Sequence, residues 1–382
     1  MKRVFRILSM ISAVSSIAGT VHTVRNMGLL RNPHASSTSS STPLVSILIP
    51  ARNEELRITS TLESVLTQTY PNFEVIILDD ASTDATSEVV QKIISHDSRF
   101  RLMQSHEKLP VGWLGKPWAA QRLGQLANGE ILFFLDADVI LEPDALDVCV
   151  SLMIDAELDV MCPYPSQTTT TFAQRIMQPL LHWSWLTTLP LDIAESSKRP
   201  SLTAGNGQIL FITSEMYKKV NGHECVKSQV LEDINLVRQV KLHDGKGGVV
   251  DGTAVATCLM YNTNGEMIEG YTKSLWNAFG TRSGAVVTGL GLFLVYALPL
   301  FLLLSPDKKT RRRSGVAYLA AALGRVIIGK RMNHVVWPDA FLHPLSILGF
   351  NALTIRSLQL HQRNELTWKG RSIHAAPAKD AL

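Results

Sequence analysis

Residues 44–50 read LVSILIP, a short and almost continuous apolar run typical of a parallel strand buried on both faces of a sheet. Three further strands are expected along the chain, at 74–80 (EVIILDD), 101–104 and 130–135 (EILFFL). Helical patterns separate them, at 62–66, 89–94 and 119–127. Because strand and helix alternate four times within about 100 residues, the sequence predicts a Rossmann-like, doubly wound α/β sheet.

Polar side chains follow the buried strands, at the sheet edge where ligands of such folds bind. Residues 52–54 (RNE) follow the first strand, and the second strand ends in Asp79 and Asp80. We expect these two carboxylates to face a ligand, where they can accept hydrogen bonds from a base N–H or a ribose hydroxyl. Ser82 or Thr83 is expected to cap the helix that follows.

Asp136 and Asp138 form a D-x-D triplet directly after the 130–135 strand. Hard carboxylate oxygens at this spacing suit Mg²⁺ or Mn²⁺, which also bind substrate phosphates. A diphosphate leaving group needs such neutralisation as its bond breaks. The alternative is an acidic turn or helix cap before Glu142 and Pro143.

Glu232 and Asp233 begin an amphipathic helical pattern. Acidic residues favour the start of a helix because of the helix dipole, which is one explanation for this pair. The other is chemical, with one carboxylate deprotonating an acceptor hydroxyl or activating an acceptor carboxylate.

Four segments in order resemble the family 2 glycosyltransferases of the GT-A fold: VSILIPARNEE (45–55), VIILDDASTDAT (75–86), FFLDADV (133–139) and LEDINLVRQV (231–240). The resemblance covers about residues 44–282. It implies that Asp79 and Asp80 hold the nucleoside of a nucleotide-sugar donor, while Asp136 and Asp138 handle its diphosphate and the metal. It also implies that Asp233 is the catalytic base of an inverting, single-displacement transfer.

Four other segments resemble a membrane-attached branch that includes 4,4'-diaponeurosporenoate and hopene-associated glycosyltransferases: VGWLGKPWAAQ (111–121), GNGQ (205–208), EGYTKSLWNAF (269–279) and TWKGR (367–371). Lys116 is expected to approach the donor phosphates, the alternative being a solvated loop lysine. An acceptor or sugar loop is expected from Gly205, Asn206, Gly207, Gln208, Glu232 and Trp276. Because Trp276 stands in KSLW and the Q/R-x-x-R-W motif of processive members is absent, we expect one transfer rather than polymer synthesis.

Residues 284–305 form an uncharged apolar segment. As a helix, this segment is long enough to cross a hydrocarbon core of about 30 Å. Basic residues at 308–313 follow as a membrane-flanking cluster. The less apolar stretches 315–329 and 340–358 are expected to be membrane-associated. The sequence has a net charge of +4 but no basic patch interleaved with aromatic residues. Nucleic acid is therefore not an expected partner. Residues 7–21 fit a signal-anchor, an interfacial helix or a transit peptide.

The expected organisation is therefore an N-terminal segment with a Ser/Thr linker (1–43), a GT-A domain (44–282), membrane helices (283–358) and a polar tail (359–382). The expected function is metal-dependent transfer of a hexose, from a UDP-sugar, to a carotenoid acid, hopanoid or glycolipid. Alternatives are a polyprenyl-phosphate sugar synthase and a silent nucleotide-sugar-binding scaffold. Because nucleotide-sugars are cytosolic, the catalytic domain is expected at the membrane facing the cytosol. A cluster of basic residues after an outward span conflicts with the positive-inside tendency.

Overall fold

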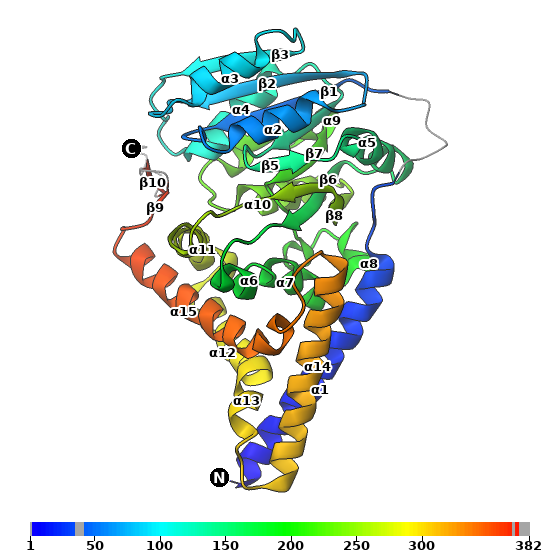
Figure 1. The fold of residues 1–382 in the computed structure, drawn as a ribbon, viewed down its shortest axis with the longest axis vertical. Helices are drawn as coiled ribbons and strands as arrows, with labels where there is room; N and C mark the ends of the chain where they lie inside the picture. Colours follow the sequence, from blue (N-terminus) through cyan, green and yellow to red (C-terminus); the bar gives the residue numbers. More distant parts are fainter. Residues whose placement is uncertain (1, 35–41, 369–370, 374–382) are drawn as a thin grey trace. The chain divides into compact units, whose positions relative to one another are not determined.

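The computed structural model describes residues 2–34, 42–368 and 371–373 (Figure 1). The chain divides into two compact units: a first unit of residues 1–30, 169–192 and 261–368, and a second unit of residues 31–168, 193–260 and 369–382. The predicted domains follow chain order, whereas these units interleave. The segments 169–192 and 261–282, predicted within the GT-A domain, belong to the first unit. The predicted Ser/Thr linker lies outside the described residues except for Thr42.

The second unit is built on a mixed sheet whose strand order is β3-β2-β1-β4-β7-β6-β8-β5 among the described residues. The strands are β1 (Val45–Ala51), β2 (Phe73–Asp80), β3 (Phe100–Ser105), β4 (Ile131–Leu135), β5 (Val139–Leu141), β6 (Val160–Gln167), β7 (Ile209–Thr213) and β8 (Gly247–Cys258). The strands β3, β2, β1 and β4 are parallel, as the sequence predicts.

Helices cover both faces of this sheet: α2 (Ile58–Leu66), α3 (Thr86–Ile94), α4 (Gly115–Leu126), α5 (Ala145–Asp155), α9 (Ser214–Lys219) and α10 (Glu232–Leu242). Because successive side chains of a strand point to opposite faces, Ile47 and Ile49 pack with α2, α3 and α5, whereas Leu48 packs with α4 and α10. Strands β1, β2 and β4 are buried on both faces, and this explains their continuous apolar runs. Short 3₁₀ turns at η1 (Pro200–Leu202) and η2 (Gly222–Val226) complete the unit.

One expectation about this unit is wrong. Neither Ser82 nor Thr83 caps α3, whose N-cap residue is Ala85 and has no side-chain cap. The carboxylate of Asp84 accepts the backbone N–H of Thr86 at 3.1 Å instead. The turn chemistry is present, but the helix begins later than the Ser-Thr pair suggests.

Strand β7 runs antiparallel to both of its neighbours, β4 and β6. Strand β7 is not among the four strands that the sequence predicts, and an apolar run by itself carries no information on strand direction. In the antiparallel register Leu135 faces Ile209, so the 205–208 loop before β7 meets the Asp136–Asp138 segment after β4.

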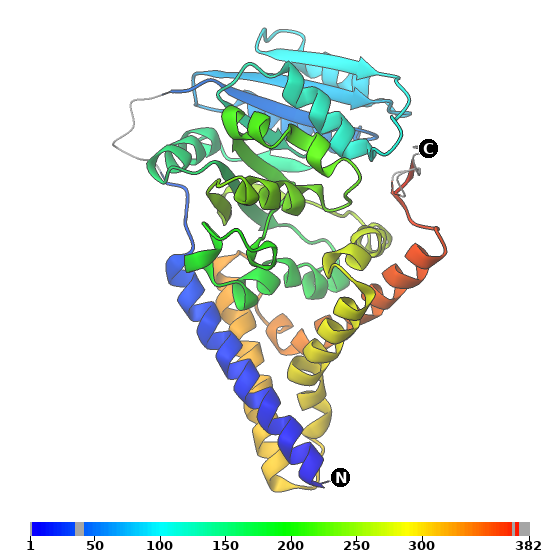
Figure 2. The ribbon, with the colours of Figure 1, turned by 180° about the vertical axis from the view of Figure 1, so that it is seen from behind.

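The first unit is helical: α1 (Lys2–Leu29), α6 (Phe172–Met177), α7 (Leu180–Thr188), α11 (Asn264–Ala278), α12 (Arg282–Leu292), the π-helical turn η3 (Phe293–Ala297), α13 (Leu298–Leu302), α14 (Lys308–Arg331), the 3₁₀ turn η4 (Asp339–Leu342) and α15 (His343–Gln362). Helix α8 (Leu191–Ala194) spans the chain position at which the units divide, and β9 (Thr367–Trp368) and β10 (Arg371–Ser372) follow α15. Helices α1 and α14 lie side by side along their length (Figures 1 and 2).

Helix α1 has the reverse of the burial pattern of a soluble helix. Its polar residues Ser12 and Ser16 are 1% and 0% exposed, whereas Val14 and Val21 are each 63% exposed. Within the described part of the chain, α1 and the 282–302 segment are long and apolar enough to cross a membrane. The latter coincides with the uncharged 284–305 run. The 315–329 stretch lies inside the 24-residue helix α14.

The 282–302 helix is interrupted at η3 because Pro299 has no backbone N–H to donate. The carbonyls of Leu294 and Val295 are left without the partners that a regular helix provides. The hydroxyl of Ser12 donates to Leu294 O at 2.6 Å, and that of Ser16 donates to Val295 O at 3.3 Å. Helix α1 therefore completes the hydrogen bonding of the interrupted helix.

Candidate active site

Asp136 and Asp138 lie where β4 ends and β5 begins, as predicted. The backbone N–H of Asp136 donates to Gln208 O at 3.0 Å, which joins the triplet to the 205–208 loop. The Oδ1 atom of Asp138 is buried and has no hydrogen-bond partner among the described residues. Burial, and then repulsion from Asp136 and Glu54, raises the pKa of Asp138 to about 7.

Lys116, in the first turn of α4, links three parts of the site. Its Nζ lies 2.8 Å from Asp136 Oδ1 and 3.3 Å from Glu232 Oε1, and it donates to Gly207 O at 3.4 Å. Burial disfavours the charged ammonium, but attraction to Asp136 and Glu232 outweighs it and raises the pKa of Lys116. Lys116 is therefore an ammonium paired with two carboxylates, with its side chain 41% exposed. Its approach to donor phosphates stays a prediction.

The two glycines of the 205–208 loop allow it to approach α10. A Cβ at Gly207 would lie 3.2 Å from both Asp233 Oδ2 and Lys116 Nζ. A Cβ at Gly205 would lie 3.1 Å from the Cα of Ile234. These contacts are tighter than most Cβ atoms show, so glycine at both positions favours the close approach of the loop to α10 and Lys116.

Asn206 and Gln208 have their side-chain amides inside the protein. Asn206 donates to Gln208 Oε1 at 3.1 Å, and Gln208 donates to the Cys258 Sγ at 2.8 Å. Gln167 also donates to Gln208 Oε1, at 2.8 Å. All four residues are buried. In this arrangement the two predicted loop residues position the loop.

Glu232 and Asp233 open α10, as predicted. Glu232 is 8% exposed, and burial raises its pKa, with Lys116 opposing that shift and Asp233 adding to it. Asp233 Oδ1 accepts the backbone N–H of Ile234 at 2.8 Å. Glu232 thus forms an ion pair with Lys116, while the Oδ2 of Asp233 lies beside the Gly207 backbone.

Asp79 and Asp80 are both buried at the end of β2. Asp79 accepts the Ser82 N–H at 3.0 Å and the Ser87 hydroxyl. Asp80 forms ion pairs with Arg122 at 3.0 Å and with Arg371. Both aspartates therefore already have partners within the protein.

Arg122 and Arg371 were missed by the sequence reasoning, although weak signals for both exist. Arg122 directly follows the 111–121 segment, and Arg371 is the last residue of TWKGR. A Cβ at Gly115 would lie 3.0 Å from Arg371 Nη1, so this guanidinium lies at the start of α4 as well as on Asp80. Neither residue follows a predicted strand, and Arg371 is distant from Asp80 in the sequence.

Trp276 belongs to the first unit, whereas Lys116, Asp136, Glu232 and the 205–208 loop belong to the second. It lies on α11 of the first unit, where its ring stacks on His361 with centroids 3.6 Å apart. Its indole N–H donates to Lys273 O at 3.0 Å. Its predicted place in an acceptor loop stays a prediction.

The residues present fit a divalent cation that also binds substrate. Within residues 2–34, 42–368 and 371–373, no group of three or more His, Cys, Asp or Glu side chains could hold a metal ion by itself. Two carboxylates do meet at Asp136 and Asp138, with one buried oxygen unpartnered and a repulsion that a cation would relieve. Mg²⁺ and Mn²⁺ suit such sites because they keep waters and bind phosphate oxygens.

The comparison with protein families decides the class. Residues 46–207 match the family model described as Glycosyl transferase family 2. The chain carries a family 2 glycosyltransferase domain. The predicted enzyme class is thereby confirmed.

This glycosyltransferase is similar to 4,4'-diaponeurosporenoate glycosyltransferase of Staphylococcus aureus strain USA300, with 24% identity over 97% of this chain and 98% of that protein. The protein of that name from strain N315 has the same identity and coverage. The resemblance to this branch is confirmed.

Among solved structures, the mannosyltransferase PcManGT from Pyrobaculum calidifontis, in complex with GDP-Man and Mn²⁺, is similar over 96% of this chain and 100% of that chain. Its TM-score is 0.57 and its identity 14%. At this identity the likeness concerns the fold, and it supports the predicted GT-A class.

Proposed function

We propose that this glycosyltransferase moves a hexose from a nucleotide-sugar, a UDP-sugar, to a lipid or terpenoid acceptor with inversion of configuration. The observation that carries the proposal is the position of Lys116 Nζ, 2.8 Å from Asp136, 3.3 Å from Glu232 and 3.4 Å from Gly207 O. Three segments far apart in the sequence meet at one cation, beside the predicted base Asp233. This is the arrangement that transfer from a charged donor requires.

The donor's diphosphate would bind near Lys116, whose ammonium provides a point charge for phosphate oxygens. Its nucleoside would bind near Asp79 and Asp80, with Arg122 and Arg371 orienting the second carboxylate. The fold relative PcManGT was solved with a nucleotide-sugar, GDP-Man, and this supports a donor of the same class. The base of the nucleotide is proposed from the family resemblance.

Asp136 and Asp138 would hold Mg²⁺ or Mn²⁺. The ion would neutralise negative charge on the diphosphate as it leaves. The unpartnered Oδ1 of Asp138 and the Mn²⁺ in the PcManGT structure support this assignment. Lys116 would compete with the ion for the oxygens of Asp136, to which it lies 2.8 and 2.9 Å away.

Asp233 would act as the general base that takes the proton from the acceptor. Glu232 is less suited to that role because its carboxylate is paired with the Lys116 ammonium at 3.3 Å. Asp233 lies in the first turn of α10, and its Oδ2 lies beside the Gly207 backbone. One base and one direct displacement are sufficient for an inverting transfer.

A lipid-like acceptor is supported by the first unit. It contains α1 and the 282–302 segment, and α1 exposes its apolar side chains while burying its polar ones. The similar protein of Staphylococcus aureus is named for a carotenoid acid, 4,4'-diaponeurosporenoate. We therefore place the enzyme at a membrane, with its sugar-transferring unit facing the cytosol, where nucleotide-sugars are made.

The test uses detergent-solubilised protein, a panel of nucleotide-sugars, Mn²⁺ or Mg²⁺ against chelator, and a total lipid extract. Metal-dependent release of nucleoside diphosphate with a new glycolipid is expected. Asp233→Asn should bind the donor but lose turnover, whereas the exposed control Asp244→Asn should keep both. A product on polyprenyl phosphate would change the acceptor class. No release from any donor would contradict the proposal, and turnover by Asp233→Asn would contradict the base.

A further inference from the structure

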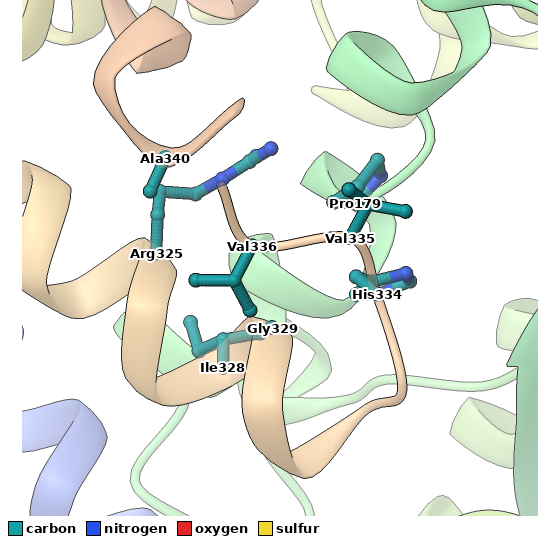
Figure 3. A pocket seen from close by; sticks show the side chains of 8 residues that line it. All are labelled: Pro179, Arg325, Ile328, Gly329, His334, Val335, Val336 and Ala340. Atoms are coloured by element: carbon teal, nitrogen blue, oxygen red, sulfur yellow. The ribbon is translucent and has the colours of Figure 1, made fainter. Parts of the chain in front are cut away.

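A small pocket in the first unit contains a buried arginine (Figure 3). Its walls come from the last turns of α14, the 332–338 loop, η4 and Pro179. Arg325 of α14 extends into the space between these walls, and His334 lies on the opposite side. The lining belongs wholly to the first unit, so this pocket is separate from the residues assigned to the donor.

The guanidinium of Arg325 is poorly satisfied. The residue is 5% exposed, and its Nη1 has no hydrogen-bond partner in the part of the chain that the structure describes. Its Nη2 donates to Ile176 O at 3.4 Å, but that carbonyl already accepts the Ser346 hydroxyl at 2.8 Å. A buried guanidinium normally has a counter-ion and a full set of acceptors, because losing its hydration is costly.

The charges around Arg325 do not balance. Asp339 is the carboxylate that attracts it, yet both oxygens of Asp339 accept from Arg175, each at 2.9 Å. Two guanidiniums thus share one carboxylate. His334 contacts His182 at 3.0 Å, and burial, followed by repulsion from Arg325, lowers the pKa of His334 to about 4. The cluster retains one positive charge, which a single anion would neutralise.

The surface next to the pocket is apolar and aromatic. Val335, Trp337 and Phe341 are 50%, 58% and 41% exposed. The rings of Trp337 and Phe341 lie 5.4 Å apart, and the Tyr318 hydroxyl donates to Phe341 O at 2.9 Å. Exposed Trp and Tyr side chains gather at membrane–water interfaces, where one end of the ring is apolar and the other is hydrated.

We propose that this pocket binds the phosphate of an anionic membrane phospholipid through Arg325, with the acyl chains lying along Val335, Trp337 and Phe341. A lipid fits better than free phosphate because the exposed apolar rings continue from the pocket on the unit that carries the apolar helices. Arginine suits this ligand because its planar fork matches the oxygens of a phosphate. The site stands independently of the sugar donor, the base and the metal.

Binding can be tested with full-length protein in phosphatidylcholine nanodiscs with and without phosphatidic acid. Phosphatidic acid should raise the unfolding temperature of the wild type. Arg325→Met should weaken its binding about 10- to 100-fold, the loss expected for a hydrogen bond to a charged group. Lys330→Met removes the same charge from an exposed position of α14 and should respond as the wild type does. Equal lipid binding by Arg325→Met and the wild type would overturn the proposal.

Stability separates this site from a merely structural arginine. In phosphatidylcholine alone, Arg325→Met should be at least as stable as the wild type, because an uncompensated buried charge is removed. If it unfolds instead, the wild type still gives an answer through ¹⁵N-histidine NMR, with His334 assigned by a His334→Gln variant. Phosphatidic acid should raise the pKa of His334, and an unchanged value would overturn the proposal. Inorganic phosphate acting as strongly as the lipid would overturn the assignment to a lipid.

Discussion

Replacing Lys116 by methionine should separate donor binding from metal binding. The ammonium lies 2.8 Å from Asp136, where two unit charges attract by about 1.5 kcal/mol in water and about 6 kcal/mol at an effective dielectric constant of 20. Because the lysine side chain is 41% exposed, solvent screens the pair, and its net contribution is about 1 kcal/mol. The free energy of unfolding should therefore fall by about 1 kcal/mol or less.

The effect on the donor should be larger than the effect on stability. A hydrogen bond to a charged phosphate contributes about 1.5–3 kcal/mol, so affinity for the nucleoside diphosphate should fall about 10- to 150-fold. Affinity for Mn²⁺ alone should stay the same or rise, because both oxygens of Asp136 lose a competing cation. Isothermal titration calorimetry on the solubilised protein measures both quantities. Lys108→Met, which removes an exposed lysine, is the matched control.

Two outcomes would refute this reasoning. Unchanged nucleotide affinity in Lys116→Met would mean that the ammonium does not contact the diphosphate. A parallel loss of nucleotide and Mn²⁺ binding, with the control intact, would mean that Lys116 organises the carboxylates rather than competing for them.

Three other changes test the site and the fold. Asp138→Asn should lose metal-dependent donor binding and all detectable transfer, as measured by release of nucleoside diphosphate; wild-type activity would exclude the metal role. Arg371→Ala should weaken nucleotide binding by up to about tenfold, because Arg122 still holds Asp80, and should leave Mn²⁺ binding unchanged by calorimetry. The double change Ser12→Ala and Ser16→Ala should lower the unfolding temperature in detergent, at about 0.6 kcal/mol for each hydroxyl; an unchanged value would show that water satisfies the two carbonyls.

Four strands of the second unit could be predicted because burial leaves a strong composition signal. Ile47, Leu48 and Ile49 are all 0% exposed, so each needed to be apolar. The strand-end carboxylates could be predicted for a related reason. Parallel strands deliver their carboxyl ends to one edge, and a charged residue directly after a buried run has few structural explanations.

The remainder depends on contacts that a linear pattern does not contain. Strand β7 is not among the four predicted strands, and its antiparallel direction is set by pairing with β4 and β6. Arg371 reaches Asp80 from a position 291 residues away, which no local spacing indicates. Trp276 was grouped with the sugar loop by motif, whereas α11 packs on α15 in the first unit. The apolar composition of the N-terminal segment was evident, but not the inward orientation of its serines.

The hydroxyls of Ser12 and Ser16 on the Leu294 and Val295 carbonyls also constrain how the chain matures. Their acceptors are synthesised some 280 residues after the hydroxyls, so α1 emerges long before the helices that it completes. Helix α1 can therefore make these two hydrogen bonds only after the segment around residue 295 has been synthesised. Proteolytic removal of α1, as for a cleaved leader, would leave two peptide carbonyls without partners in an apolar helix.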